Sequence, residues 1–370
     1  MHEKLQKLEA FGFSVVPYIL CEKNNNDSAI VQKLIDLSQN NKYPIDGIVF
    51  KIDDCETYES LGRTSHHFNG GLAYKFFDDS YPTHLRDIEW TMGRSGVLTP
   101  VAIFDEIEID GSIIGRASLH NYSIMVETLG RPYVGQEVYV YKANQIIPQI
   151  SSAVPAPQDK EVEFINLPTS CPACGGAVRL DKTNGGTSNL ICENPQCGDK
   201  LINSLDHFFG KKGLDVRGLS IATFKYLINW GYIQSAKDVF DLKKYRDDWA
   251  QKAGFGPRSV DKILTAIEES KNNPLDKFIT ALGIPLVGST ISKEICAHEK
   301  DWQSFRADID NHFDFTSWDT FGLALAEELY KFDYSEADYI VANYMNLTNP
   351  CAITASKELE GLKIAITGSL

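Results

Sequence analysis

Residues 171–197 read CPACGGAVRLDKTNGGTSNLICENPQC and hold four of the eight cysteines of this 370-residue chain. The cysteines form two close pairs, Cys171 with Cys174 and Cys192 with Cys197, and 17 residues separate the pairs. Pairs spaced in this way can place four thiolates around a zinc ion, and a four-cysteine site leaves no position open for catalysis. Two disulfides are the alternative. Because nothing marks the chain as secreted, the spacing predicts a structural zinc finger.

Length and composition limit what surrounds this segment. With 370 residues, 43% of them hydrophobic, the chain is long enough for two or three domains. It has no run of 18 apolar residues, and its first residues do not form a signal-peptide pattern, which favours a cytoplasmic protein without a membrane span. The net charge of −14 excludes a protein held to nucleic acid by a general basic surface, so any such binding must use local donors.

On the N-terminal side, apolar residues recur in short runs of helical or strand period. Residues 1–20 predict the end of a helix, a turn at Gly12 and a strand, and residues 30–37 predict a helix. Residues 43–53 (YPIDGIVFKID) alternate as a strand, with Ile48 and Phe50 on one face and Val49 and Lys51 on the other. The segment 71–79 (GLAYKFFDD) predicts a second strand.

Lysines stand in both of these apolar strands, at Lys51 and Lys75. Burial of an ammonium group is costly unless it has a partner. Two such lysines could converge on one anion, and phosphate is a ligand that lysine binds as a point charge. Two solvent-facing lysines on half-exposed strands are the alternative, and composition alone favours that simpler interpretation.

Residues 83–150 alternate as the strands of a small barrel. Runs such as RDIEWTMG, GVLTPVAIFDEIEI and QEVYVYKA have a period of two and are separated by glycine-centred turns. About five strands of this kind suit an OB-fold, a common platform for nucleic acid. Arg94, His120, Asn121 and Lys142 lie near the turns and are candidates to contact a DNA backbone. Taken singly, each is more simply explained as a solvated or satisfied polar residue.

After the cysteines, the sequence repeats a helical unit. Glycines 218, 256, 288 and 322 are 38, 32 and 34 residues apart, and apolar residues of helical period follow each of them. A glycine-rich hairpin lets backbone N–H groups approach a phosphate, and the following helix N-terminus adds positive potential. Gly218, Gly256 and Gly288 are therefore candidate DNA contacts, whereas the fourth unit lacks a second glycine. A purely structural helical array is the alternative.

These motifs, in this order, resemble NAD-dependent DNA ligases. DGIVFK (46–51) and AYKF (73–76) are similar to the fourth and fifth nucleotidyltransferase motifs of that family. LRDIEWTMGRSGVLTPVA (85–102), RASLHN (116–121) and KANQIIPQI (142–150) are similar to its OB-fold. The four cysteines resemble its zinc finger, and ELEGLKIAITGSL (358–370) resembles the first strand of its BRCT domain.

The resemblance implies a multidomain α+β fold. It assigns residues 1–78 to the C-terminal part of a nucleotidyltransferase (adenylation) domain, which is a partial, β-rich segment. It assigns 79–155 to an OB-fold barrel, 165–200 to a four-Cys zinc finger, 201–347 to a helix-hairpin-helix array and 358–370 to a truncated BRCT start.

The resemblance also implies roles for particular residues. Lys51 and Lys75 would contact the adenylate during AMP transfer, and Asp46 would hold the nucleotide pocket. NAD would be the AMP donor, zinc would be structural, and magnesium is implied by the phosphate chemistry. Nicked double-stranded DNA would bind irrespective of sequence, through Arg94, His120, Asn121 and the hairpin glycines.

The lysine of the family's K-x-D-G motif, which receives AMP, is missing from these 370 residues. The only Asp-Gly pairs, at 46–47 and 110–111, have Pro44 and Glu108 at the position of the lysine. The family's R-A-G-D-x-I-P segment appears as KANQIIP (142–148), without its Arg and Asp.

We therefore expect one subunit of a split NAD-dependent DNA ligase, inactive without a second polypeptide that carries the N-terminal adenylation half and the lysine. One alternative is a non-catalytic, nick-binding protein built from ligase parts. Another is a protein whose zinc segment and helical repeats bind only other proteins.

Overall fold

A computed structural model describes residues 1–21, 27–40, 45, 47–64, 67–75, 79–143, 146–159, 161–182 and 186–350. Contacts divide the chain into two compact units, of which the first comprises residues 1–91, 99–167 and 182–189 and the second comprises 92–98, 168–181 and the chain from 190 onward. The expected BRCT start at 358–370 lies outside the described residues. No helix among the described residues is both long and apolar enough to cross a membrane.

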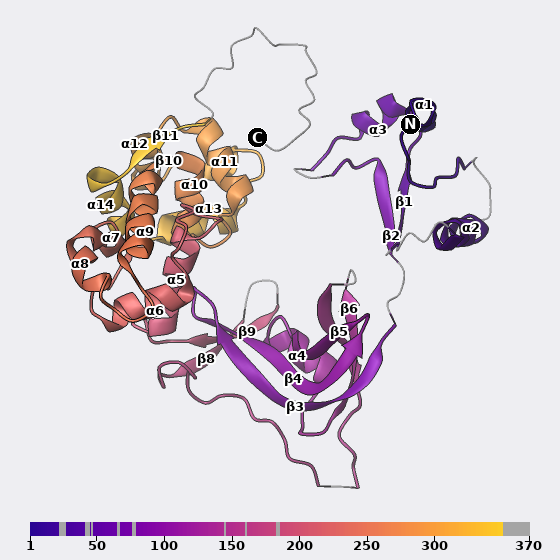
Figure 1. Ribbon diagram of the computed structural model, residues 1–370, viewed down its shortest axis with the longest axis horizontal. Coiled ribbons are helices and arrows are strands. Elements are labelled where there is room, and N and C mark those ends of the chain that lie inside the picture. The colour runs from indigo at the N-terminus through magenta and orange to yellow at the C-terminus, as the bar shows by residue number, and fades with distance from the viewer. Residues whose placement is uncertain are drawn as a thin grey trace. The chain divides into compact units, whose positions relative to one another are not determined.

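The first 79 residues form helices and one two-stranded antiparallel sheet (Figure 1). The elements are α1 (His2–Ala10), α2 (Asp27–Asn40), β1 (Gly47–Lys51), α3 (Cys55–Ser60) and β2 (Gly71–Lys75). The helix end, the turn at Gly12 and the helix over 30–37 are confirmed. The predicted strand over 13–20 is wrong, because a strand needs the N–H and C=O groups of a neighbour and no described segment pairs with these residues.

The next region, residues 81–153, forms a barrel whose strand alternation sets its core. Its elements are β3 (Tyr81–Met92), β4 (Val97–Ile109), β5 (Ser112–Ser118), α4 (Tyr122–Leu129), β6 (Glu137–Ala143) and β7 (Ile147–Ala153). The strands pair in the order β7-β6-β3-β4, with β5 on β4. Residues of one parity point inward, as Leu98, Ala102 and Phe104 of β4 do. Five strands with a helix between the third and fourth give the predicted OB-fold.

The cysteine segment contains a short hairpin of β8 (Val178–Lys182) and β9 (Ser188–Cys192). The C-terminal end of β9 pairs with the start of β4, where Val97 lies opposite Ile191 and Leu98 opposite Leu190. Immediately after the last cysteine, α5 (Gly198–Phe209) begins with Cys197 as its N-cap residue.

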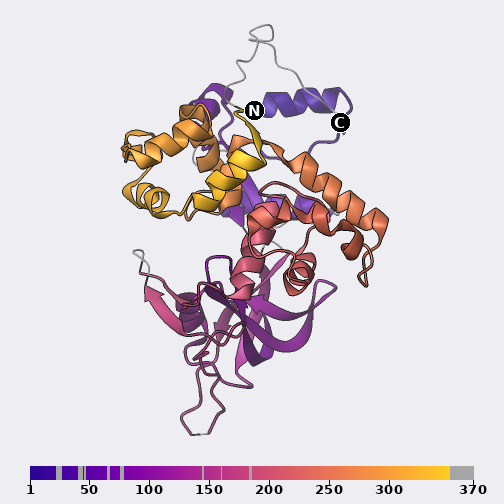
Figure 2. The same ribbon diagram turned by 90° about the vertical axis from the view of Figure 1, so that its left-hand side faces the viewer.

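The helices that follow α5 gather with it into one bundle around a continuous apolar core (Figure 1 and Figure 2). They are α6 (Ile221–Asn229), α7 (Ala236–Val239), η1 (Leu242–Tyr245), α8 (Arg246–Trp249), α9 (Pro257–Ser270), α10 (Leu275–Leu282), α11 (Ser289–His298), α12 (Trp302–Asp310), η2 (Phe315–Ser317), α13 (Leu323–Lys331) and α14 (Ser335–Asn343). Two short strands, β10 (Asn272–Pro274) and β11 (Asn346–Thr348), pair in parallel at its edge.

The four glycines of the repeat each precede a helix, as the sequence predicts. Gly256, Gly288 and Gly322 are the N-cap residues of α9, α11 and α13. Gly218 lies three residues before α6 and has a positive φ of 93°. Only Gly218 therefore needs glycine for its backbone conformation, while the other three adopt φ angles open to any residue.

Candidate functional site

The two lysines selected from the sequence lie on β1 and β2. The register pairs Lys51 with Gly71 and Gly47 with Lys75, so the two lysine positions share a face of the sheet but lie at its opposite ends. Four residues of strand separate them, which is about 13 Å along the strand direction. Because lysine side chains are long and flexible, this spacing is compatible with two lysines that reach one phosphate or that hold two points of a larger ligand such as a nucleotide.

The face that holds the lysine positions is open. Lys51 is exposed, and Val49 on the same face is 58% exposed. On the other face, Ile48 is 9% exposed but Leu72 and Tyr74 are 71% and 48% exposed. The side chain of Lys75 and the whole of Asp46, the third predicted residue, lie outside the described residues. The described residues would therefore contact a ligand on this face from one side and leave its other side uncovered.

The four cysteines come together as their spacing predicts. All four Sγ atoms lie within 4.8 Å of one another, and Cys171, Cys192 and Cys197 are buried. The Sγ atoms of Cys174 and Cys192 are 3.7 Å apart, too far for a disulfide. A tetrahedral zinc site with Zn–S bonds of about 2.3 Å requires sulfur atoms about 3.8 Å apart. The donor set and its spacing therefore fit one zinc ion held by four thiolates.

The surroundings of the cysteines affect their protonation in different ways. The N–H group of Gly176 is the main cause of a lowered pKa for Cys174, at about 6, while burial raises the pKa of Cys192 to about 12. A buried thiol such as Cys192 stays protonated at neutral pH unless a metal stabilises its thiolate. Lys200 donates to the Cys192 carbonyl oxygen at 2.6 Å, which fixes the backbone at this ligand.

The OB-fold residues proposed for DNA contact have different surroundings. Arg94, in the β3–β4 turn, and His120 are exposed, and His120 has a positive φ of 59°. Asn121 caps α4, because its side chain accepts a hydrogen bond from the Ile124 N–H at 2.9 Å. Lys142 is buried, and its ammonium group donates to the Ile109 carbonyl oxygen at 2.6 Å. The suggestion that Lys142 grips DNA is therefore wrong, since its charge tethers the end of β4 inside the barrel.

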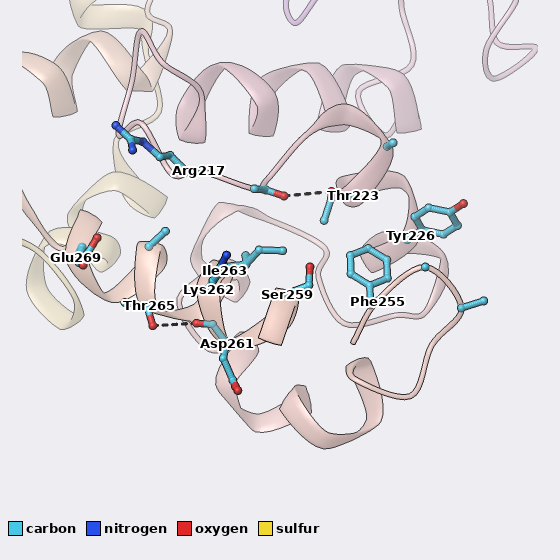
Figure 3. A pocket seen from close by; sticks show the side chains of 15 residues that line it. Arg217, Thr223, Tyr226, Phe255, Ser259, Asp261, Lys262, Ile263, Thr265 and Glu269 are labelled. Carbon is cyan, nitrogen blue, oxygen red and sulfur yellow. Dashed lines mark hydrogen bonds between the residues drawn. The ribbon is translucent and has the colours of Figure 1, made fainter. Parts of the chain in front are cut away.

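An open pocket of about 950 Å³ lies beside the Gly218 hairpin (Figure 3). Arg217 and Gly218 line it from the hairpin, and Ser259 and Lys262 line it from α9. The Thr223 hydroxyl lies 3.4 Å from the Gly218 carbonyl oxygen and helps to hold the hairpin in place. Arg217 and Lys262 form no ion pair with a described carboxylate, so both charges remain available to an anion.

Sequence reasoning selected Gly218 and missed these two cations. Arg217 directly precedes the glycine, and Lys262 follows Gly256 by six residues, within the second turn of α9. A search for basic residues within two turns of each hairpin glycine would have found both.

Alanine substitution should destabilise the chain at Gly218 but not at Gly256. A Cβ on Gly218 would lie 2.8 Å from Cγ1 of the buried Ile263, and its φ is unfavourable for alanine, whereas a Cβ on Gly256 meets no atom within 4 Å. We expect Gly218→Ala to lower stability by roughly 1–3 kcal/mol. Gly256→Ala should change stability by less than about 0.5 kcal/mol.

Thermal unfolding of the two variants, side by side with the unmodified chain, measures this difference. Equal melting temperatures for the two variants would contradict the close approach of Gly218 to α9.

An OB-fold joined to a four-thiolate cluster and to glycine-led helices is typical of proteins that handle nucleic acid. Residues 1–79 match the family model of the NAD-dependent DNA ligase adenylation domain, and residues 82–162 match that of the NAD-dependent DNA ligase OB-fold domain. The chain belongs to the NAD-dependent DNA ligase family.

Curated relatives agree with these matches. The chain is 34% identical over 375 residues to the DNA ligase of Lachnoclostridium phytofermentans, covering all of this chain and 56% of that protein. It is 33% identical to the DNA ligase of Ruminiclostridium cellulolyticum, over 97% of this chain and 54% of that protein. It is 36% identical to the DNA ligase of Thermotoga neapolitana, over 82% of this chain and 43% of that protein. The chain thus spans about half the length of the curated relatives it matches.

Proposed function

We propose that this chain takes part in the sealing of DNA nicks with NAD as the AMP donor. In this reaction an adenylated 5′-phosphate at the nick is attacked by the adjacent 3′-hydroxyl. The observation that carries the proposal is the open face of β1 and β2, where Lys51 and the position of Lys75 stand about 13 Å apart within a segment that matches a ligase adenylation domain. Lys51 and Lys75 bind the adenylate at two points and stabilise negative charge as AMP is transferred, and Asp46 orients the nucleotide.

The nucleophile for AMP is supplied by residues other than these 370, because the chain has no K-x-D-G sequence. We propose a second polypeptide that carries this motif. Support comes from the poor packing of residues 1–79, among whose described residues only Ser38, Ile48 and Gly70 are buried. The segment 13–20, which pairs with no strand that the structure describes, adds to it, since Phe13 and Val16 are 63% and 74% exposed. A complementing protein surface would cover these apolar residues and pair with this segment.

The remaining domains hold the DNA. We assign residues 201–347 to a helix-hairpin-helix domain, in which Gly256 and Gly288 cap helices and leave open space where a side chain would stand. Backbone N–H groups at these points can approach phosphates without reading bases. Arg217 and Lys262 add charge beside Gly218, and Arg94, His120 and Asn121 add contacts from the OB-fold. These contacts keep the two ends of the nick in reacting geometry.

Zinc and magnesium have separate roles in this proposal. Zinc at the four cysteines is structural, because no coordination position is open. Magnesium would assist phosphate chemistry. Among the described residues, the four cysteines are the only cluster of metal-ligand side chains found, so this part of the chain offers no ready-made magnesium site.

A nick-sealing assay with NAD tests the proposal. The chain is assayed alone and together with a purified polypeptide that carries the K-x-D-G half of an adenylation domain. We expect sealing only when both are present, because neither holds both the nucleophile and the DNA-binding domains. Sealing by the chain alone would refute the need for a second polypeptide.

A non-catalytic nick-binding protein is the second candidate function. The KANQIIP sequence at 142–148 favours it, because the Arg and Asp expected there in a ligase are replaced and Lys142 is buried. Tight binding to nicked duplex, without sealing under any condition that includes the second polypeptide, would select this function.

A further inference from the structure

A second group of basic side chains lies where the β3–β4 turn meets the end of α5 and the end of α10, whose C-cap residue Gly283 is followed five residues later by Gly288. It consists of Arg94 in the turn, His207 in the last turn of α5 and Lys212 in the loop after α5. All three belong to the same compact unit of the chain.

Gly283 is the point at which Arg94 and His207 come together, and Lys212 acts on the same imidazole through its charge. It ends α10 in a left-handed conformation with φ of 68°. A Cβ built on Gly283 would lie 3.0 Å from Nε of Arg94 and 3.2 Å from Cδ2 of His207. The side chains of Arg94 and His207 therefore both pack against the backbone of Gly283, and a residue with a side chain at position 283 would displace them.

The imidazole of His207 is held by one ring nitrogen only. Nε2 lies 3.0 Å from the carbonyl oxygen of Thr280 in α10, to which it donates a hydrogen bond. Its other nitrogen, Nδ1, has no hydrogen-bond partner among the described residues. Burial lowers the pKa of His207, and the charges of Arg94 and Lys212 lower it further, while the hydrogen bond to the Thr280 carbonyl and the charge of Asp206 act in the opposite direction.

The two permanent cations of the group are not neutralised. Other arginines of the chain, such as Arg246 and Arg306, form ion pairs with aspartates. Within the described ranges, neither Arg94 nor Lys212 forms an ion pair with a carboxylate, although the chain has 50 acidic residues. Both charges act unfavourably on a protonated His207, and an anion bound beside the imidazole would offset them.

We propose that Arg94, His207 and Lys212 form a binding site for one phosphate group of a nucleic-acid backbone, and that His207 takes up a proton when the phosphate binds. Arg94 offers its fork of N–H donors, Lys212 acts as a point charge, and protonated His207 donates from Nδ1. The Nε2 hydrogen bond to Thr280 is unchanged by this proton uptake. The identification of the ligand as a nucleic acid rests on the proposed function, whereas the phosphate site itself does not.

Proton uptake fixes the sign of the pH dependence. Without phosphate, the pKa of His207 lies below its ordinary value, so the ring is neutral at neutral pH. A phosphate favours the charged ring and raises this pKa. Binding should therefore tighten as the pH falls, because the proton that binding requires becomes easier to obtain.

Fluorescence anisotropy of the full chain with nicked duplex tests the site. We expect the affinity to rise roughly three- to tenfold from about pH 7.5 to about pH 6, and His207→Gln to abolish most of that rise. Arg94→Gln and Lys212→Ala should each reduce the slope of log affinity against log salt by about 0.9. Lys243→Ala removes an exposed charge from η1 as a matched control and should leave the pH dependence intact. Unchanged pH dependence in His207→Gln would overturn the proposal.

A second measurement separates this proposal from nick sealing. Histidine NMR signals are followed during pH titration with and without inorganic phosphate. The pKa of His207 should rise with phosphate in the unmodified chain and not in Arg94→Gln, whether or not the chain seals nicks. A phosphate-independent pKa in the unmodified chain would overturn the site, even if sealing is observed.

Discussion

Replacing Lys51 with alanine is expected to lower nick sealing by about 10²-fold or more when the K-x-D-G polypeptide is supplied. Lys51 is exposed at the end of β1, on the same face as the Lys75 position. In the proposed reaction its ammonium group stabilises negative charge that increases as AMP is transferred. The loss should therefore appear in the rate of sealing, while affinity for nicked duplex stays within about twofold.

Controls for Lys51→Ala must exclude an effect of charge alone. Lys33→Ala removes an exposed lysine from α2 in the same segment of the chain, and it should keep the full sealing rate. Quantification of adenylated intermediate on the DNA distinguishes slow AMP transfer from slow phosphodiester formation. Equal sealing rates for Lys51→Ala and Lys33→Ala would exclude Lys51 from the nucleotide site.

The second large effect concerns the zinc cluster. Cys192→Ser is expected to remove zinc and to unfold the segment around 168–197, because binding of structural zinc is worth on the order of 10 kcal/mol. Cys192 is fully buried and ends β9, which pairs with β4. Loss of the metal should therefore also loosen the start of β4. Metal analysis should give about one zinc per unmodified chain and almost none in the variant.

A matched cysteine variant and a pH series sharpen this test. Cys21→Ser changes an exposed cysteine outside the cluster and should retain zinc. Zinc affinity of the unmodified chain should fall as the pH falls, since protons compete with zinc for the four thiolates. Zinc retained at full stoichiometry in Cys192→Ser would show that the four thiolates do not form the site.

The sequence predicted those features that depend on local spacing. The helix after each repeat glycine follows from apolar residues of helical period, and the cysteine cluster follows from two close pairs with turn residues between them. The glycine-centred turns between the barrel strands were also predicted, and at Gly111 the turn is present with positive φ angles of 48° at Asp110 and 71° at Gly111. The OB-fold strands follow from alternation of inward and outward residues.

Features that depend on distant parts of the chain were not predictable. The segment 13–20 has strand-like composition but no partner strand among the described parts of the chain, and composition cannot supply one. A lysine such as Lys142 is expected at the surface. The alternation of β6 nevertheless points its side chain into the barrel, where its ammonium group donates a hydrogen bond to the Ile109 carbonyl oxygen. The approach of Arg94 and His207 to Gly283 brings together residues more than 70 positions apart, so no local pattern indicates it.

The short parallel pair of β10 and β11 has a consequence for synthesis on the ribosome. Asn272 pairs with Asn346, and the ring of Tyr344 stacks on that of Phe240 at 5.0 Å. The N–H of Lys237 likewise donates to Glu336 in α14. The early helices of the bundle therefore cannot complete their packing until residues about a hundred positions later have been synthesised. If synthesis pauses before β11, the part of the bundle that has emerged from the ribosome exposes apolar core residues, and we expect chaperones to bind it.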